Sequence, residues 1–452
     1  MRAPPKPSTL QALLKLAWPV VLARATQSVI GFADAIMVAP LGEDAMAAAI
    51  TGNLNAFSFI IFPMGTAFIV QSFTAQLRGR GELEAAPRYA TYGLALAVLA
   101  GLVALAAIPF LPRIVGALEY SPAVASLMQQ YLAIRLLSVA PAVATEALGQ
   151  WFGGMGNTGP EMIAGVIAML TNVLLCYLLI EPRFGLPGYG VAGSAWAAVI
   201  ATTLGFFVIV TIYTRRARWS FDFRMPEFLR LLRFGAPNGM NWFLEFTAFT
   251  LFINLVVGHL GTSTLAAFNA VLQLMNVSFM PSFGLASAGA ILAGEAIGRR
   301  ALDEVWPTVR LTTLLASGFM LTLSTLYALF ATPLMTLFEP PGAGGARFLE
   351  ASVQMLMFVP LWQVADAVAI TFGETLRAAG DTTWPMVVRI ALAWLVFTPI
   401  AWFLVRYADG GIPTVMLSLI VYVAILAALL GGRYAYGKWR LINLVGPVVT
   451  PR

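Results

Sequence analysis

The sequence predicts an all-α polytopic membrane protein with twelve transmembrane helices in two six-helix lobes, related by a pseudo-twofold axis along the membrane normal. Three observations support this fold class. The 452 residues are 59% hydrophobic and 11% charged, whereas a soluble domain carries about 25% charged residues. The chain contains twelve apolar runs, and its mean hydropathy is +0.82. Landmarks of the first half recur in the second half at a nearly constant offset.

The twelve runs are long enough to cross the hydrocarbon core of a bilayer, which takes about 20 residues of helix. The first six cover residues 16–39, 50–75, 89–112, 124–148, 161–181 and 189–213. The second six cover residues 234–258, 265–292, 308–331, 351–376, 385–406 and 412–432. We therefore predict a first lobe at 1–213, a basic cytoplasmic linker at 214–233, a second lobe at 234–433 and a cytoplasmic tail at 434–452.

The basic residues predict the orientation of these spans. Of the 27 Lys and Arg residues, 21 lie on the side that holds both termini, five lie on the other side, and Arg24 lies inside a span. Basic loops face the cytoplasm, so we expect an integral protein of the plasma membrane with both termini in the cytoplasm. In a bacterium this membrane is the inner membrane. The same rule explains the net charge of +6 without a nucleic-acid partner. Membrane lipids are the expected surroundings.

The internal repeat predicts how the two lobes are related. The matches at an offset of 219 residues include Gly42 with Gly261, Gly65 with Gly284, and Pro141 with Pro360. After a slip of five residues, Gly156-Asn157-Thr158 matches Gly380-Asp381-Thr382. Because each repeat holds six spans, both halves enter the membrane with the same polarity, and we expect a cavity between them.

Several functional classes lack the residues they need. The chain has one histidine, His259, and one cysteine, Cys176. A single histidine excludes a multi-histidine metal site, and its predicted position at a helix end argues against a Ser-His-Asp triad. No GxxxxGK[ST] loop is present, which argues against bound nucleotide. We expect neither an enzyme nor a cofactor.

Glu245 and Asp366 are the leading candidates for an ion or proton site. Glu245 lies twelve residues after Arg233, about 18 Å into its helix, and Asp366 lies at about the same depth before Arg377. A charge at that depth costs roughly 3 kcal/mol, so intramembrane acids usually mark ion or proton paths. Neither acid has a basic residue predicted at matching depth in its own half, and bound Na⁺ or H⁺ is the expected occupant.

Other polar residues in the spans have two interpretations. Arg24 and Glu146 lie at similar depth, and we expect a structural ion pair. Asp34, nearer the outer end of its span, is either a third cation-site residue or a solvated helix end. Asn172 is predicted to hydrogen-bond Asp34 or to join helices.

Around these acids we predict a substrate-lining set. Phe249 lies one turn after Glu245 and Trp362 one turn before Asp366, which suits an aromatic wall for an organic cation, although packing is the alternative. Gln27, the first-half counterpart of Glu245, and Met275, an adaptable apolar side chain, complete the set.

The sequence resembles the multidrug and toxic compound extrusion (MATE) transporters, and most closely their NorM-like branch. The resemblance rests on WPVVLARATQSVIGFADAIMVAPLGEDAMAAA, on APNGMNWFLEF at the seventh span and on ADAVAITFGETLRAAGDTTWP at the tenth. It implies export of cationic, amphipathic compounds driven by inward Na⁺ or H⁺. It also implies a V-shaped pair of lobes, a second-lobe cation site at Glu245 and Asp366 and a first-lobe acid at Asp34. The chain departs from the pattern at Cys176 and Trp362, where relatives often carry an acid and a tyrosine.

The resulting hypothesis is a secondary active antiporter for multidrug efflux, with H⁺ or Na⁺ as coupling ion and small organic cations as substrates. A lipid-linked oligosaccharide flippase of the same superfamily is an alternative, although it needs a cationic cavity and Arg24 is the deep base on offer. A membrane enzyme or a receptor is the third hypothesis.

Overall fold

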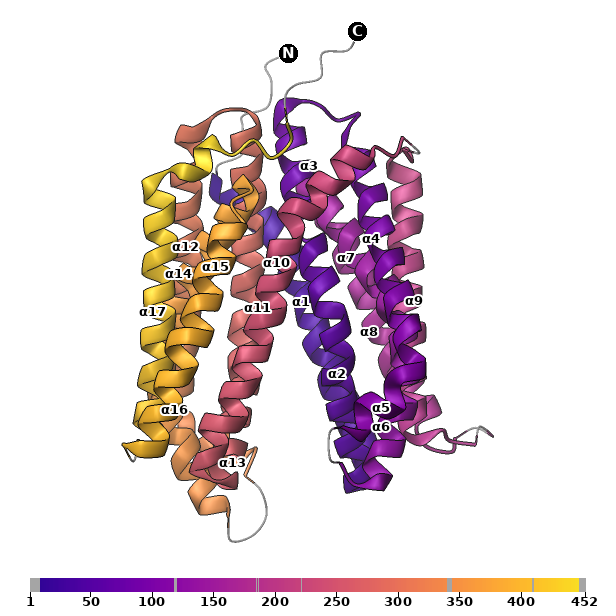
Figure 1. Ribbon diagram of the computed structural model, residues 1–452, viewed down its shortest axis with the longest axis vertical. Coiled ribbons are helices and arrows are strands. Elements are labelled where there is room, and N and C mark those ends of the chain that lie inside the picture. The colour runs from indigo at the N-terminus through magenta and orange to yellow at the C-terminus, as the bar shows by residue number, and fades with distance from the viewer. Residues whose placement is uncertain are drawn as a thin grey trace. The chain divides into compact units, whose positions relative to one another are not determined.

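The computed structural model describes residues 9–117, 120–183, 185, 187–220, 222–339, 344–408 and 410–446, except for the side chain of Phe32. Residues 1–8 and 447–452, which the topology prediction places in the cytoplasm, lie outside the described residues. Every element of the described part is a helix, and twelve helical segments are long and apolar enough to cross a membrane (Figure 1). The predicted all-α class with twelve spans is confirmed.

The described residues of the first half form nine α-helices and three short 3₁₀ segments. They are α1 (Thr9–Val38), η1 (Ala39–Leu41), α2 (Glu43–Ala67), α3 (Ile69–Arg80), α4 (Ala86–Ala107), η2 (Ile108–Phe110), α5 (Leu111–Gly116), α6 (Pro122–Arg135), η3 (Leu136–Ser138), α7 (Val139–Gly154), α8 (Gly159–Leu179) and α9 (Gly190–Arg216).

In the second half, the residues that the structure describes form eight α-helices, two π-helical segments and three 3₁₀ segments. They are α10 (Met225–Phe252), the π-helix η4 (Ile253–Val257), η5 (Gly258–Leu260), α11 (Thr262–Gly298), η6 (Leu302–Glu304), α12 (Val305–Leu329), α13 (Ala331–Thr336), α14 (Gly345–Ala379), α15 (Thr383–Ala391), the π-helix η7 (Leu392–Phe397), α16 (Thr398–Tyr407), α17 (Ile412–Tyr436) and η8 (Lys438–Leu441).

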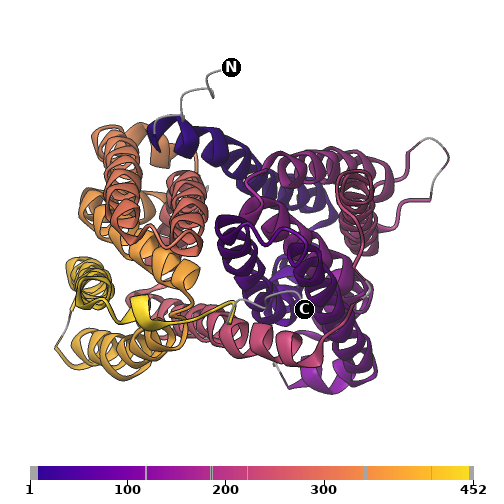
Figure 2. The same ribbon diagram turned by 90° about the horizontal axis from the view of Figure 1, so that it is seen from above.

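Backbone contacts divide the chain into two compact units. Residues Leu22–Gly239 form one unit, called the first unit below. The second unit joins the residues up to Val21 with those from Met240 onward. Two long helices, α1 and α10, therefore each contribute to both units. Within each unit the helices run alongside one another (Figure 2). The predicted lobe and linker boundaries stay a prediction.

The sequence repeat is also a repeat of local structure. Gly42 and Gly261 both have φ near +100°, each between a 3₁₀ turn and the start of a long helix. Gly156 and Gly380, the pair predicted after the slip of five residues, have φ of 76° and 89°. Glycine adopts these left-handed conformations without steric cost. The two halves therefore share the turn that leads into their second span.

Small residues allow close helix packing in the first unit. A Cβ atom added at Gly93 of α4 would lie 2.7 Å from Cβ of Ala147 on α7, and one at Gly101 would lie 2.6 Å from Cβ of Ala140. Such small-residue stripes let membrane helices approach closely where apolar burial gives little driving force. The close contact of α4 with α7 fixes the helix that carries Glu146.

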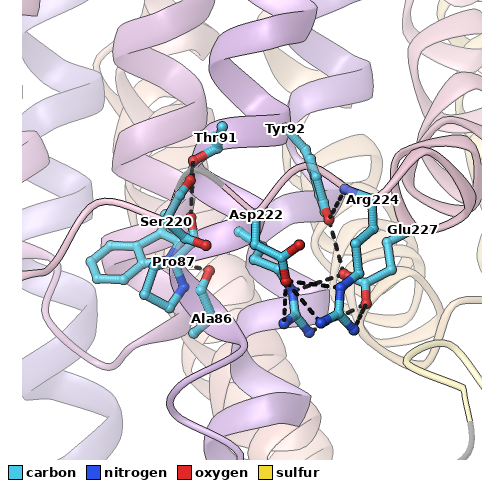
Figure 3. A network of polar contacts seen from close by, with 10 residues as sticks. Ala86, Pro87, Thr91, Tyr92, Ser220, Asp222, Arg224 and Glu227 are labelled. Atoms are coloured by element: carbon cyan, nitrogen blue, oxygen red, sulfur yellow. Dashed lines mark hydrogen bonds and ion pairs between the residues drawn. The ribbon is translucent and has the colours of Figure 1, made fainter.

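A polar network holds the connection between α9 and α10 against α4 (Figure 3). Arg88 of α4 donates two hydrogen bonds to the Glu227 carboxylate, at 3.0 and 3.2 Å, and the Tyr92 hydroxyl donates to the same group at 3.0 Å. The Asp222 carboxylate bonds Arg224 and raises the pKa of this guanidinium. The basic connection is therefore fixed to the unit that precedes it.

Candidate functional site

Glu245 forms an ion pair inside the membrane-spanning region of the second unit. Nη1 of Arg389 lies 2.7 Å from Oε1 and 2.9 Å from Oε2 of Glu245. Glu245 belongs to α10 and Arg389 to α15, and both helices are parts of candidate membrane spans. The Glu245 side chain is 36% exposed and that of Arg389 17%. The protein thus leaves part of the Glu245 side chain uncovered.

Asp366 is the second acid of this cluster. It lies in α14, is partly buried, and interacts electrostatically with both Glu245 and Arg389. Tyr422 of α17 lies close enough to interact with all three. The structure thus brings together the two acids that the sequence predicted as a cation site.

The backbone around the cluster departs from regular α-helix. The π-helical segment η7 begins three residues after Arg389, and η4 begins eight residues after Glu245. The indole Nε1 of Trp394, in η7, donates to the carbonyl of Leu244 at 3.1 Å, next to Glu245. π-Helical turns often occur at functional sites, because they reorient side chains and free backbone carbonyls.

The charge of the cluster determines what it can bind. With both acids ionised, Glu245, Asp366 and Arg389 carry a net charge of minus one, in helices where an uncompensated charge is costly. One proton or one monovalent cation neutralises the cluster. Arg389 bonds both oxygens of Glu245, and no hydrogen bond or ion pair to Asp366 is present among the described residues, so Asp366 is the less compensated of the two acids.

The prediction that Glu245 lacks a cation at its own depth is wrong. Arg389 is one of the 21 basic residues that the charge count places on the side of the termini, yet it lies in α15 within the span Thr383–Tyr407 and bonds Glu245. The signal was available, since Arg389 lies five residues inside the apolar run 385–406. Basic side chains near span ends usually extend to the interface, which is why the count misassigned it.

The predicted substrate-lining residues fall into two groups. Trp362 and Met275 are buried, at 6% and 7% exposure, in the hydrophobic core of the second unit. Phe249 packs at the edge of this core, with ring centroids 6.1 Å from Phe252 and 6.4 Å from Phe268. Gln27 belongs to the other unit and is exposed.

Asp34 lies beside the single cysteine in the first unit. The buried Cys176 thiol donates to Oδ1 of Asp34 at 3.1 Å and lies 3.9 Å from Oδ1 of Asn172. Asn172 is 1% exposed, and within the described part of the chain its Nδ2 has no hydrogen-bond partner. The structure therefore brings Asp34 and Asn172 into one cluster, with Cys176 between them.

Arg24 and Glu146 form the ion pair that the sequence predicted. Arg24 Nη2 lies 2.8 Å from Glu146 Oε1, and Nη1 lies 3.2 Å from Oε2. The same Nη2 lies 3.2 Å from Oε1 of Glu161, the third residue of α8. Sequence reasoning missed Glu161 because it opens the run 161–181, where an acid normally contacts solvent.

Comparison with known proteins identifies the family of this chain. The MatE family model matches residues 19–178 and 240–403, which together are more than half of the chain. The chain belongs to the MatE family. The expected resemblance to MATE transporters is therefore confirmed, with both acids of the Glu245 cluster inside the second matched region.

This MATE protein has relatives that match it over most of its length. It is 28% identical over 440 residues to a probable multidrug resistance protein NorM of Rhizobium meliloti, covering 95% of this chain and 93% of the relative. It is 27% identical over 381 residues to the multidrug resistance protein NorM of Vibrio cholerae, covering 82% of each.

Solved structures confirm the MATE fold. A crystal structure of MATE in complex with MaL6 matches with a TM-score of 0.88 and 20% identity, over 96% of this chain and 98% of that one. The outward-facing conformation of a multidrug resistance MATE family transporter matches with a TM-score of 0.86 and 20% identity, over 96% and 97%.

Proposed function

We propose that this MATE protein is a secondary active antiporter that exports cationic, amphipathic organic compounds in exchange for H⁺ or Na⁺. The observation that carries the proposal is the cluster of Glu245, Asp366 and Arg389, whose net negative charge inside membrane spans is neutralised by one monovalent cation. Family membership and the NorM relatives agree with multidrug efflux by antiport. The exchange for H⁺ or Na⁺ and the positive charge of the substrates are proposals that go beyond the family assignment.

Each group of residues has its own role in this proposal. Asp366, with Glu245, binds the coupling ion, and Asp34 with Asn172 forms a second cation site in the first unit. Phe249 and Gln27 contact the substrate, whereas Trp362 and Met275, predicted with them, are buried in the core against which Phe249 packs. The protein lies in a plasma membrane, the inner membrane of a bacterium, with both termini in the cytoplasm, and it catalyses no covalent reaction.

The charges argue against the flippase alternative. A lipid-linked pyrophosphate needs free cationic side chains at membrane depth. Arg24 is 4% exposed and bonds Glu146 and Glu161, while Arg389 bonds both oxygens of Glu245. These two arginines therefore already hold carboxylates, and a pyrophosphate would have to displace those carboxylates.

Ethidium transport in proteoliposomes tests the proposal. A pH gradient and a Na⁺ gradient are imposed separately, and ethidium movement against its concentration gradient is followed by fluorescence. The antiporter proposal predicts accumulation under at least one gradient and none without a gradient. Ethidium movement indifferent to both gradients would favour a flippase, an enzyme or a receptor.

A further inference from the structure

A second cluster of one arginine and two carboxylates lies in the first unit, away from the residues assigned to ion coupling. Arg24 of α1 contacts Glu146 of α7 at 2.8 Å and Glu161 of α8 at 3.2 Å. The three side chains are 5%, 7% and 11% exposed. The Arg24 guanidinium also lies over the ring of Phe68, 5.2 Å from its centroid. One guanidinium thus joins three helices.

The charge of this cluster does not balance. Arg24 and Glu146 are the charged groups that act electrostatically on Glu161. If both glutamates are ionised, the cluster carries a net charge of minus one in a nearly dry site. A buried charge without a partner is strongly unfavourable, and a group in this position binds a proton instead. Two carboxylates that share a site commonly hold one proton between them.

A buried amide beside the cluster supplies a hydrogen-bond acceptor for that proton. Gln150, one turn after Glu146 on α7, is 2% exposed, and its Nε2 donates to Glu146 Oε1 at 2.6 Å. Within the described part of the chain, Oε1 of Gln150 has no hydrogen-bond partner. An ionised carboxylate cannot donate to this oxygen, whereas a protonated one can after the amide turns over. The amide can therefore bond the cluster in either protonation state.

Other ionisable groups surround these helices at greater distance. Arg78 of α3 covers the turn between α7 and α8 at Gly156. Tyr213 of α9 packs on Trp151, and Tyr89 of α4 stacks on Phe73. The remaining ionisable groups on α7, on α8 and on the helices packed against them are Lys15, Asp34, Glu43, Asp44, Arg80, Arg88, Tyr92, Cys176, Tyr177, Arg215 and Arg216.

We propose that Arg24, Glu146, Glu161 and Gln150 form a proton-binding site in the first unit, which holds one exchangeable proton between the two glutamates. The site is separate from Glu245 and Asp366 and from Asp34. Removing either glutamate leaves Arg24 with a single carboxylate, a neutral pair that binds no proton. This proposal does not depend on the proposed transport function, because proton binding can be measured without substrate.

Proton uptake by the purified full-length protein in lipid nanodiscs tests the proposal. The protons bound between about pH 9 and pH 5, the range in which buried glutamates titrate, are counted by potentiometric titration. The carbonyl stretch of protonated carboxyl groups is followed by infrared spectroscopy over the same range. The variants are Glu161→Gln, Glu146→Gln and the double variant. Glu84→Gln, an exposed acid in the turn between α3 and α4, corrects for the loss of a surface carboxylate.

The proton losses of the two single variants are not expected to add in the double variant. Relative to Glu84→Gln, each single variant binds one proton fewer and loses the same carbonyl band. The double variant loses no second proton, because the two glutamates share one. Proton uptake and carbonyl bands in Glu161→Gln equal to those of the control would overturn the proposal. A second proton lost in the double variant would overturn the shared site. Size-exclusion profiles identify folded variants, and Glu146→Gln replaces Glu161→Gln if the latter aggregates.

Discussion

Nη1 of Arg389 bonds both carboxylate oxygens of Glu245, at 2.7 and 2.9 Å, between helices α15 and α10. This ion pair distinguishes the two acids of the cluster, Glu245 and Asp366, from each other. Glu245 is paired with a positive charge, and we propose that it positions the cluster. Asp366 interacts with both partners without a hydrogen bond or ion pair among the described residues, and we propose that it is the acid that exchanges its cation.

Glu245→Gln is expected to stop coupled efflux and also to lower stability. Without the carboxylate, Arg389 has no anionic partner at 2.7 Å. We expect a loss of about 1–2 kcal/mol, below the 3–5 kcal/mol of a fully buried pair, because Glu245 is 36% exposed. Thermal melts in detergent measure this loss. Glu350→Gln, an exposed acid on α14, is the control, and equal melting of the two variants would contradict the structural role of the pair.

The Arg24 cluster predicts an order of stability among multiple variants. Arg24→Met with Glu146→Leu removes the ion pair but leaves Glu161 without its arginine, at 3.2 Å in the present structure. An unpaired buried charge costs about 3–5 kcal/mol. Adding Glu161→Leu should therefore raise the melting temperature of the double variant. A triple variant that melts below the double variant would show that Glu161 is not held by Arg24.

Glu227→Gln should loosen the connection between α9 and α10. The change weakens the hydrogen bonds from Arg88 and Tyr92. We expect trypsin to cleave after Arg215, Arg216 and Arg218 about tenfold faster, since a hydrogen bond to a charged group contributes roughly 1.5–3 kcal/mol. Gel analysis of timed digests measures the rate, with Glu84→Gln as control. Unchanged cleavage would mean that the network does not restrain this segment.

The charge count of the two arginine clusters predicts electrogenic exchange. One charge moving inward gains about 2.3 kcal/mol per 100 mV, and a monovalent substrate cation moving outward loses the same. A single ion at Asp366 gives electroneutral exchange, and each further monovalent ion that enters, at Glu161 or at Asp34, adds one inward charge. In vesicles clamped with K⁺ and valinomycin, we expect wild-type export to follow the imposed potential and Glu161→Gln export to depend on it less steeply. Identical responses to potential would contradict this assignment.

Much of the fold follows from the sequence because its signals are local. The apolar runs give the twelve spans, and the repeated glycines give the shared turns at Gly42 and Gly261. The pairing of Arg24 with Glu146 follows from equal depth. Depth alone, however, does not report which helices are neighbours. The pairing of Arg389 with Glu245 and the contact of Glu161 with Arg24 depend on the packing of α15 on α10 and of α8 on α1, which no local pattern encodes.

The function of Asp366 is tested most directly by substrate-driven ion flux in proteoliposomes. Proteoliposomes that contain wild type, Asp366→Asn or the control Glu350→Gln are loaded with a pH-sensitive or Na⁺-sensitive dye. Ethidium is then added on the side from which it is exported. We predict that ethidium drives counter-movement of H⁺ or Na⁺ in wild type and the control. We predict none in Asp366→Asn, because a neutral amide cannot exchange a cation. Wild-type ion flux in a folded Asp366→Asn protein would contradict the proposed coupling site.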